Sequence, residues 1–144
     1  MSTGEGPRPI VVGVDGSEGS IEALRVARRL AMALDAPVEV VGCWEWPAMF
    51  DPTNSPDWDP EGDARELARE TIAAVYGDAS AVTLRISSGP TARSLIEAGL
   101  GAEMLVVGSR GRGGFTGLLL GSVSATCAEH AHCPVLVVHP QADQ

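Results

Sequence analysis

Short runs of apolar, mostly β-branched residues alternate along this chain with longer segments of helical periodicity, and this alternation restricts the fold more than any other feature. The runs fall at 10–14, 38–44, 81–87, 104–108 and 134–140, and the helical segments at 17–34, 61–77, 90–100 and 122–130. A helix between each pair of strands implies a parallel sheet with right-handed crossovers and helices on both faces. We therefore expect one α/β domain over residues 1–144.

The order of the strands decides where such a domain would bind a ligand. Five strands connected in this way usually take the order 3-2-1-4-5 or 2-1-3-4-5, and we predict a five-stranded, doubly wound sheet of order 3-2-1-4-5. A ligand then binds at the carboxyl ends of the strands where the winding direction reverses, between the first strand and the fourth. The turn Asp15-Gly16-Ser17 and the loop after 104–108 are expected to face each other across that crevice.

Charge and composition exclude several classes of function. The net charge of −9 argues against nonspecific binding to nucleic acid or to an anionic membrane. All ten basic residues are arginine, so the chain has no lysine for a Walker loop, a Schiff base or a general base. The apolar runs are too short to span a bilayer, and the amino-terminal residues lack the apolar region of a signal peptide. We therefore expect a cytoplasmic protein that contacts neither membrane nor nucleic acid.

The loop after 104–108 is rich in glycine, yet it matches neither common phosphate-binding pattern. The Walker pattern fails because the loop lacks lysine. The dinucleotide pattern GxGxxG fails because Gly111-x-Gly113 is followed at the required spacing by Thr116. The loop must therefore bind an anion by other means, if it binds one at all.

Two backbone elements and two side chains offer such means. Gly108 and Gly111 let main-chain amides approach a ligand without obstruction by a Cβ atom. Gly121 precedes the last helix, so the amides of its first residues, Ser122 and Val123, point outward at the positive end of the helix dipole. Arg110 and Arg112 can bind phosphate in a bidentate manner, with solvated surface charge as the alternative interpretation.

The spacing Gly108-x2-Gly111-x9-Gly121-Ser122 resembles the signature G-x2-G-x9-G-[ST] of the ATP-binding branch of the universal stress protein family. The resemblance extends over nearly the whole chain: the segments "IVVGVDGSEGS", "SSGPTARSLIEAGLGAEMLVVGSRGRGG" and "HCPVLVVHP" look like the first strand and turn, the centre and the closing strand of that family. It implies a protein that binds ATP with Mg²⁺ and acts as a stress or regulatory module.

The same resemblance implies a role for individual residues. Asp15 would reach the ribose or a nucleotide-bound Mg²⁺, with ordinary Asx-turn chemistry as its alternative role. Gly13, the backbone of Trp44, Val107 and Gly108 would border the base and ribose, and Gly111, Gly121, Ser122 and Val123 would hold the phosphates. The resemblance also implies a homodimer in which two copies of the last strand, 134–140, pair in an antiparallel manner.

Three questions stay open at this stage. The protein could instead process nucleotides, by slow ATP hydrolysis, autophosphorylation or adenylyl transfer, or it could be an interaction protein that binds AMP, cyclic AMP or no nucleotide. The acidic, proline-rich segment 45–60 could be a flap over a site or a solvated excursion. Cys127, His130, His132 and Cys133 have ligand-like spacing for zinc, although the resemblance makes Cys133-Pro134 an ordinary junction between a helix and a strand.

Overall fold

The computed structural model describes residues 6–54, 57–110 and 120–140. Its elements, in chain order, are β1 (Ile10–Gly13), α1 (Glu18–Leu34), β2 (Val38–Trp44), the 3-10 helix η1 (Pro52–Asn54), α2 (Pro60–Tyr76), β3 (Thr83–Ser88), α3 (Thr91–Ala98), β4 (Met104–Gly108), α4 (Ser122–His130) and β5 (Val135–Val138). The alternation of strands and helices predicted from the sequence is confirmed. The first and last strands are shorter than predicted, and the third is shifted toward the carboxyl terminus.

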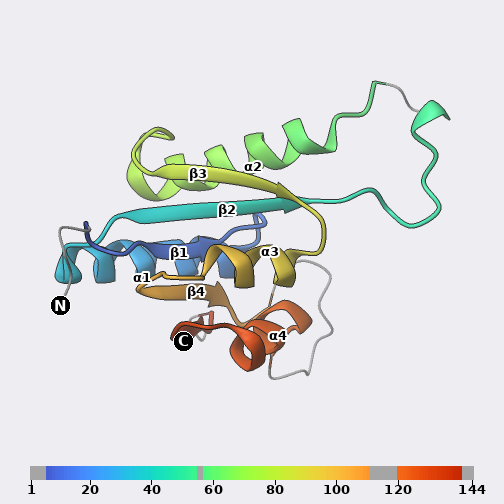
Figure 1. Cartoon of the computed structure of the whole chain (residues 1–144). Helices are drawn as coiled ribbons and strands as arrows, with labels where there is room; N and C mark the ends of the chain where they lie inside the picture. Colours follow the sequence, from blue (N-terminus) through green and yellow to red (C-terminus); the bar gives the residue numbers. More distant parts are fainter. Residues whose placement is uncertain (1–5, 55–56, 111–119, 141–144) are drawn as a thin grey trace.

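The five strands form one parallel sheet of order β3-β2-β1-β4-β5, as predicted. Strand β1 lies at the centre, with Ile10 in register with Val38 of β2 on one side and with Met104 of β4 on the other. The crossovers through α1 and α2 lead from β1 toward β3, and those through α3 and α4 lead to β4 and β5 (Figure 1). The winding direction therefore reverses between β1 and β4.

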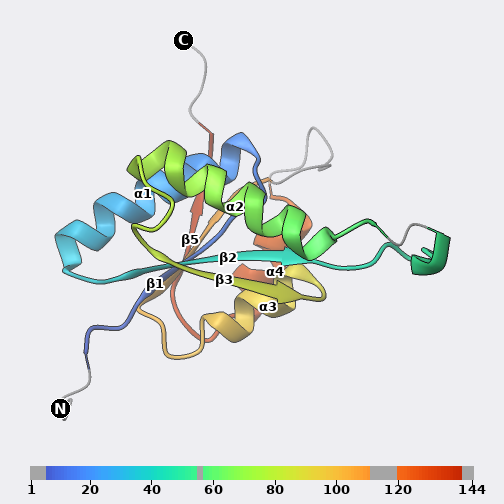
Figure 2. The ribbon, with the colours of Figure 1, turned by 90° about the horizontal axis from the view of Figure 1, so that it is seen from above.

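The alternating side chains of the central strands divide the core into two layers. Val12 and Val40 pack with α1 and α2 on one face of the sheet, whereas Val11 and Leu105 pack with α3 and α4 on the other. Figure 2 shows α1 and α2 along one side of the sheet and α3 and α4 along the opposite side. Strands covered on both faces are apolar at nearly every position, which explains the continuous apolar runs of the sequence.

Local chemistry accounts for the ends of the long helices. The Ser17 hydroxyl accepts the amide of Ser20 at 3.2 Å and caps α1, as its position before the helical segment predicts. A carboxylate oxygen of Asp59 accepts the amide of Gly62 at 3.0 Å and caps α2. Helix α2 ends at Gly77, whose φ of 82° is the left-handed conformation that glycine adopts most readily.

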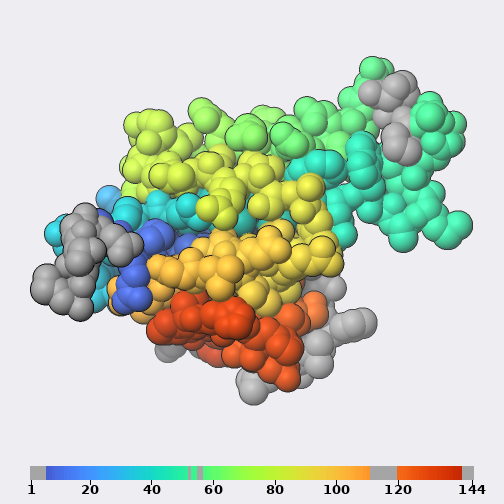
Figure 3. Space-filling view, in the orientation of Figure 1, coloured from blue at the N-terminus to red at the C-terminus, as the bar shows by residue number. Residues whose placement is uncertain are grey.

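The segment between β2 and α2 stands away from the rest of the molecule. Figures 1 and 2 both show it beyond the ends of β2 and α2, and the space-filling view in Figure 3 shows it as a separate projection. Of the two alternatives for residues 45–60, the excursion agrees with this geometry and the flap over the crevice does not.

Candidate functional site

The carboxyl end of β4 and the amino terminus of α4 are joined by a pair of short hydrogen bonds. The amide of Gly121 donates to the carbonyl oxygen of Ser109 at 2.6 Å. The hydroxyl of Ser124 donates to the same oxygen at 2.8 Å, and it lies 3.1 Å from the carbonyl oxygen of Gly121. One carbonyl group thus brings together two parts of the predicted phosphate site that are separated by the residues between 109 and 121.

The first turn of α4 has the geometry of an anion-binding terminus. Gly121 occupies the N-cap position with extended backbone angles, φ −73° and ψ 168°, and no side chain caps the helix. Ser122 is exposed at the first helical position, and Val123 is half-buried behind it. The first amides of a helix have no intrahelical acceptor, so those of Ser122 and Val123 are suited to accept a phosphate at this end.

Asp15 organises the turn that follows β1. Its Oδ1 atom accepts the amide of Ser17 at 2.9 Å, and its own amide donates to the Ser20 hydroxyl at 3.3 Å. The Asx-turn interpretation of Asp15 is therefore confirmed. The contact orients the carboxylate group at the carboxyl end of β1, beside the strand that precedes the glycine loop.

A close backbone contact holds the β1–α1 turn against the end of β4. A Cβ atom on Gly108 would lie 3.0 Å from the carbonyl carbon and oxygen of Gly19, and a Cβ atom on Gly19 would lie 2.8 Å from the carbonyl oxygen of Arg110. The first turn of α1 can approach this loop only because both positions are glycine.

Gly19 is a site residue that the sequence reasoning missed. A glycine inside a helix is less stable than alanine by about 1 kcal/mol, so its presence in the first turn of α1 was the available signal of close packing.

The remaining predicted residues lie at the same edge of the sheet or beside it. Gly13 ends β1, with a methyl group of Leu95 at 2.8 Å from the position of a Cβ atom. Val107 is buried in β4, and Arg110 is exposed just beyond that strand. Gly111 and Arg112 lie outside the described residues.

Trp44 ends β2 and is in register with Ser88 of β3. Its carbonyl oxygen accepts the amide of Gly89 at 2.8 Å, so one of the two acceptor positions of that oxygen is used within the sheet. Its indole ring meets the ring of Trp46 edge to face, with the ring centroids 5.6 Å apart. The side chain therefore belongs to the projecting segment, and the backbone belongs to the end of the strand.

His139 is the second residue that the sequence reasoning missed, because it expected no histidine near Gly108. Strand β5 places Val138 in register with Gly108, and the carbonyl oxygen of Val138 accepts the amide of Ser109 at 2.8 Å. His139 follows directly and is exposed. The register of a parallel pair is not encoded in the periodicity of either strand, so the sequence gave no signal of this proximity.

The thiols of the chain are unsuited to metal binding. Burial raises the pKa of Cys127 to about 11, and the neighbouring thiols of Cys133 and Cys43 raise it as well. Burial also raises the pKa of Cys133, although a hydrogen bond to the backbone of Leu105 opposes the shift. Zinc binds thiolates, and among the described residues no three His, Cys, Asp or Glu side chains are grouped to hold an ion. The run 127–133 does not form a zinc site in this geometry.

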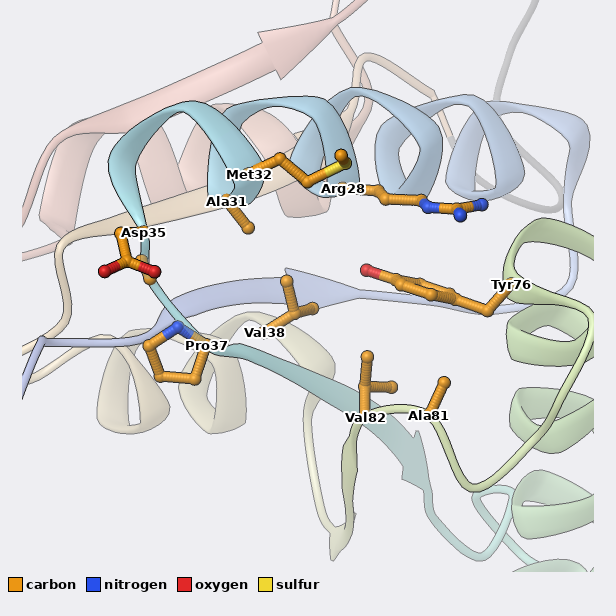
Figure 4. Close-up of a pocket in the computed structure, with 10 residues that line it drawn as sticks. Arg28, Ala31, Met32, Asp35, Pro37, Val38, Tyr76, Ala81 and Val82 are labelled. Carbon is orange, nitrogen blue, oxygen red and sulfur yellow. The ribbon is translucent and has the colours of Figure 1, made fainter.

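An open pocket of about 440 Å³ lies at the opposite end of the sheet, between the carboxyl ends of α1 and α2 (Figure 4). It is lined by Met32, Val38, Val82 and Tyr76, and the Arg28 guanidinium lies 4.8 Å from the centre of the Tyr76 ring. These residues surround the amino ends of β2 and β3, whereas the predicted site lies at the carboxyl ends of β1 and β4. The pocket is therefore separate from the candidate site.

Comparison with known proteins gives relatives of one kind. The chain is 37% identical over 138 residues to a universal stress protein of Mycolicibacterium smegmatis, covering 92% of this chain and 46% of that protein. It is 36% identical over 143 residues to a universal stress protein of Mycobacterium tuberculosis, covering 95% and 50%. The chain thus spans about half the length of the curated relatives it matches.

Solved structures with the same fold include proteins crystallised with nucleotides. The universal stress protein UspA of Lactobacillus plantarum superposes with a TM-score of 0.77 at 20% identity, over 91% of this chain and 97% of that one. A universal stress protein in complex with cAMP gives 0.64 at 29% identity, over 94% and 98%. One from Archaeoglobus fulgidus in complex with dAMP gives 0.59 at 19% identity, over 91% and 97%.

The ranges that the structure describes contain no helix that is both long and apolar enough to cross a membrane. The sequence model of the universal stress protein family matches residues 7–139, which is nearly the whole chain. This match, the relatives and the sheet order agree, and the chain belongs to the universal stress protein family.

Proposed function

We propose that this chain binds an adenine nucleotide, ATP with Mg²⁺, in the crevice at the carboxyl ends of β1 and β4, and that it acts as a nucleotide-dependent regulatory module of a stress response. The observation that carries the proposal is the double hydrogen bond to the Ser109 carbonyl, which joins the end of β4 to the amino terminus of α4. Its effect is to set a row of outward amides beside the turn that holds Asp15.

The chemistry of each residue suggests how the nucleotide would lie. The amides of Ser122 and Val123 would bind the phosphates, with Gly121 giving them access and the guanidinium of Arg110 adding charge. Gly111 and Arg112 take the same phosphate role by resemblance to the family. Asp15, a hard oxygen donor, would face the ribose or a phosphate-bound Mg²⁺ from the opposite turn.

The base would lie along the ends of the central strands. Gly13, Val107 and Gly108 offer small or apolar surfaces there, and Trp44 would contribute the remaining acceptor position of its carbonyl oxygen. The relative crystallised with cAMP, at 29% identity, supports an adenine nucleotide as the class of ligand. ATP rather than AMP or cyclic AMP is favoured by the two arginines and the helix terminus, which together suit more than one phosphate group.

The proposal covers the assembly of the protein as well. We take residues 1–144 as one nucleotide-binding unit, located in the cytoplasm and paired as a homodimer through the last strand. Within the described residues β5 is an edge strand that pairs with β4 alone, and an unpaired edge favours pairing with another strand.

Two measurements test nucleotide binding directly. Nucleotide retained by the purified protein is identified by mass spectrometry after extraction, and the melting temperature is compared with and without Mg-ATP. A ligand at a hundredfold excess over its Kd stabilises the native state by about 2.7 kcal/mol, so we expect a clear increase. An unchanged melting temperature in millimolar Mg-ATP would contradict the proposal, and ATP turnover faster than about one per minute would indicate an enzyme instead.

Substitution of Ser122 tests the position of the phosphates. We expect Ser122→Asp to preserve or raise the stability of the nucleotide-free protein, because a carboxylate at the first turn of a helix is favoured by about 0.3–1 kcal/mol. The same carboxylate should abolish ATP binding by repelling the phosphates, as should Gly121→Glu. Binding is measured by isothermal titration calorimetry.

The neutral variant Ser122→Asn is the matched control and should bind nearly as well as the natural protein. Asp15→Ala should weaken binding while leaving the domain folded, as judged by circular dichroism. Full affinity in Ser122→Asp would place the phosphates elsewhere.

A further inference from the structure

The segment between β2 and α2 carries a cluster of aromatic side chains, and we call residues 45–59 the aromatic arm. The three tryptophans of the whole sequence are Trp44, at its base, and Trp46 and Trp58, within it. Phe50, one of only two phenylalanines in the chain, joins them. The arm projects from the body of the protein (Figure 3), so this aromatic surface contributes nothing to the two core layers around the sheet.

The rings hold one another in a defined arrangement. Trp46 and Phe50 are stacked, with centroids 5.1 Å apart and planes inclined by 5°. Trp58 meets both rings edge to face, at 5.5 Å and 4.7 Å, and its indole N–H donates to an oxygen of Asp63 in α2 at 3.2 Å. A turn closed by the Phe50 amide and the Pro47 carbonyl, at 3.0 Å, supports the stack. The arm is therefore a built structure with fixed side chains.

The cluster keeps much of its apolar surface in contact with solvent. Trp46 is 42% exposed, Trp58 is 38% exposed, and Met49 at the turn is fully exposed. Met49 also has a φ of 68°, a left-handed conformation that costs energy for a residue other than glycine. An exposed aromatic group on a strained, projecting turn is a poor way to stabilise a fold, and such surfaces mark binding sites.

The charge around the cluster is of one sign. No basic residue occurs between Arg29 and Arg65, whereas carboxylates occur at positions 45, 51, 57, 59, 61 and 63. This negative charge repels nucleic acid and anionic lipid, and it attracts cationic protein segments. The stacking of Trp46 directly on Phe50 leaves no space for a cation between these rings, so a cation must bind on their outer faces.

We propose that the aromatic arm is a docking surface for an arginine-containing segment of a partner protein. A guanidinium group is planar, so it can stack on an exposed indole face and still reach a neighbouring carboxylate with its N–H groups. Asp51 and Asp57 are exposed on the arm beside the rings and offer such carboxylates. Lysine lacks the planar group, and we expect it to bind more weakly. The inference rests on the arm and holds independently of nucleotide binding.

Intrinsic tryptophan fluorescence tests this proposal, because every tryptophan of the chain lies in the cluster. The full chain is titrated with a synthetic peptide of Arg-Gly-Gly repeats and, separately, with a Lys-Gly-Gly peptide of the same length. We expect a saturable change in emission with the arginine peptide, weaker binding of the lysine peptide, and loss of affinity as salt rises. Equal affinity for the two peptides would overturn the proposal, since it would show that charge alone is recognised.

Paired variants locate the binding surface. Asp51→Asn combined with Asp57→Asn should weaken the arginine peptide by roughly two- to thirtyfold, the effect of two exposed ion pairs. Glu66→Gln combined with Glu129→Gln removes the same charge from exposed helix positions away from the arm and is the control. Trp46→Leu should weaken binding by roughly two- to fivefold. Equal losses in the arm and control variants would overturn the assignment.

The same samples distinguish a second copy of the chain as the occupant. Sedimentation velocity is measured for the natural protein and for Trp46→Leu without peptide. We expect the same oligomeric state in both, because the chain is acidic and its arm would repel an identical arm. A change of oligomeric state in Trp46→Leu would show that the arm serves self-association, and would overturn the proposal.

Discussion

Ser109 contributes to the candidate site through its backbone rather than its side chain. Its carbonyl accepts both the Gly121 amide and the Ser124 hydroxyl, and its own amide donates to Val138 of β5. The Oγ atom of Ser109, by contrast, is buried and has no hydrogen-bond partner among the residues that the structure describes. The two serines thus differ: one hydroxyl holds the amino terminus of α4, and the other is unsatisfied.

This difference gives a prediction at the scale of single residues. Ser124→Ala should reduce the free energy of unfolding by about 1 kcal/mol, because it removes a buried hydroxyl bonded to main-chain oxygens. Ser109→Ala should leave the stability unchanged or raise it slightly, because it removes an unsatisfied buried group. Urea denaturation of both variants measures the two values. A larger loss in Ser109→Ala than in Ser124→Ala would show that the Ser109 hydroxyl has a partner.

The sequence predicted these residues unevenly. Gly108, Gly121 and Ser122 were identified by spacing, because glycines and a helix start are local features of the chain. The bond from Ser124 to Ser109 was not foreseen, because it depends on how closely α4 approaches the end of β4. The role of His139 was missed for the same reason.

At the scale of elements, α1 and β4 are fitted together by glycine. The contact of Gly19 with Gly108 and with the Arg110 carbonyl sets the distance between the first turn of α1 and the loop that carries the predicted phosphate site. Helix propensity would favour alanine at position 19, so the tertiary contact outweighs the local preference there.

Substitution at Gly19 tests this fit. Gly19→Ala should lower the free energy of unfolding by about 1–2 kcal/mol, because overpacking against backbone outweighs a gain of about 1 kcal/mol in helix propensity. It should also weaken nucleotide binding by displacing the loop. Arg29→Ala, at an exposed position of the same helix, is the control and should change stability by no more than about 0.5 kcal/mol. Thermal melting checks both, and a stabilised Gly19→Ala would contradict the contact.

For the whole molecule, the strand β5 determines how the sheet can be extended. The carbonyl oxygens of Pro134 and Val138 face β4, where they accept the amides of Leu105 and Ser109. Since backbone groups alternate along a strand, those of Leu136 also face β4, whereas those of Val135 and Val137 face outward. The outward groups are the ones that a second copy of β5 would pair with. In relatives about twice as long as this chain, the additional half is a further candidate for this edge.

Proline substitutions separate the two sets of backbone groups. Val137→Pro should convert the proposed dimer to a monomer while leaving the domain folded, because it removes an outward amide at an edge. Leu136→Pro should destabilise the domain by about 3 kcal/mol or more, because its amide pairs with β4. Sedimentation equilibrium and melting temperature are measured for both. A dimer that persists in folded Val137→Pro would show that this edge is not the interface.

The sequence by itself determined the class of fold, the parallel sheet, its order and the helices on each face, since periodicity and crossover handedness are local properties of the chain. It also located the glycines and the helix start of the candidate site. Only the tertiary structure decided that Gly19 touches Gly108, that Ser109 holds α4, that His139 lies beside the site, and that the tryptophans gather on a projecting arm. Each of these depends on the register or approach of segments distant in sequence, which no pattern within one segment contains.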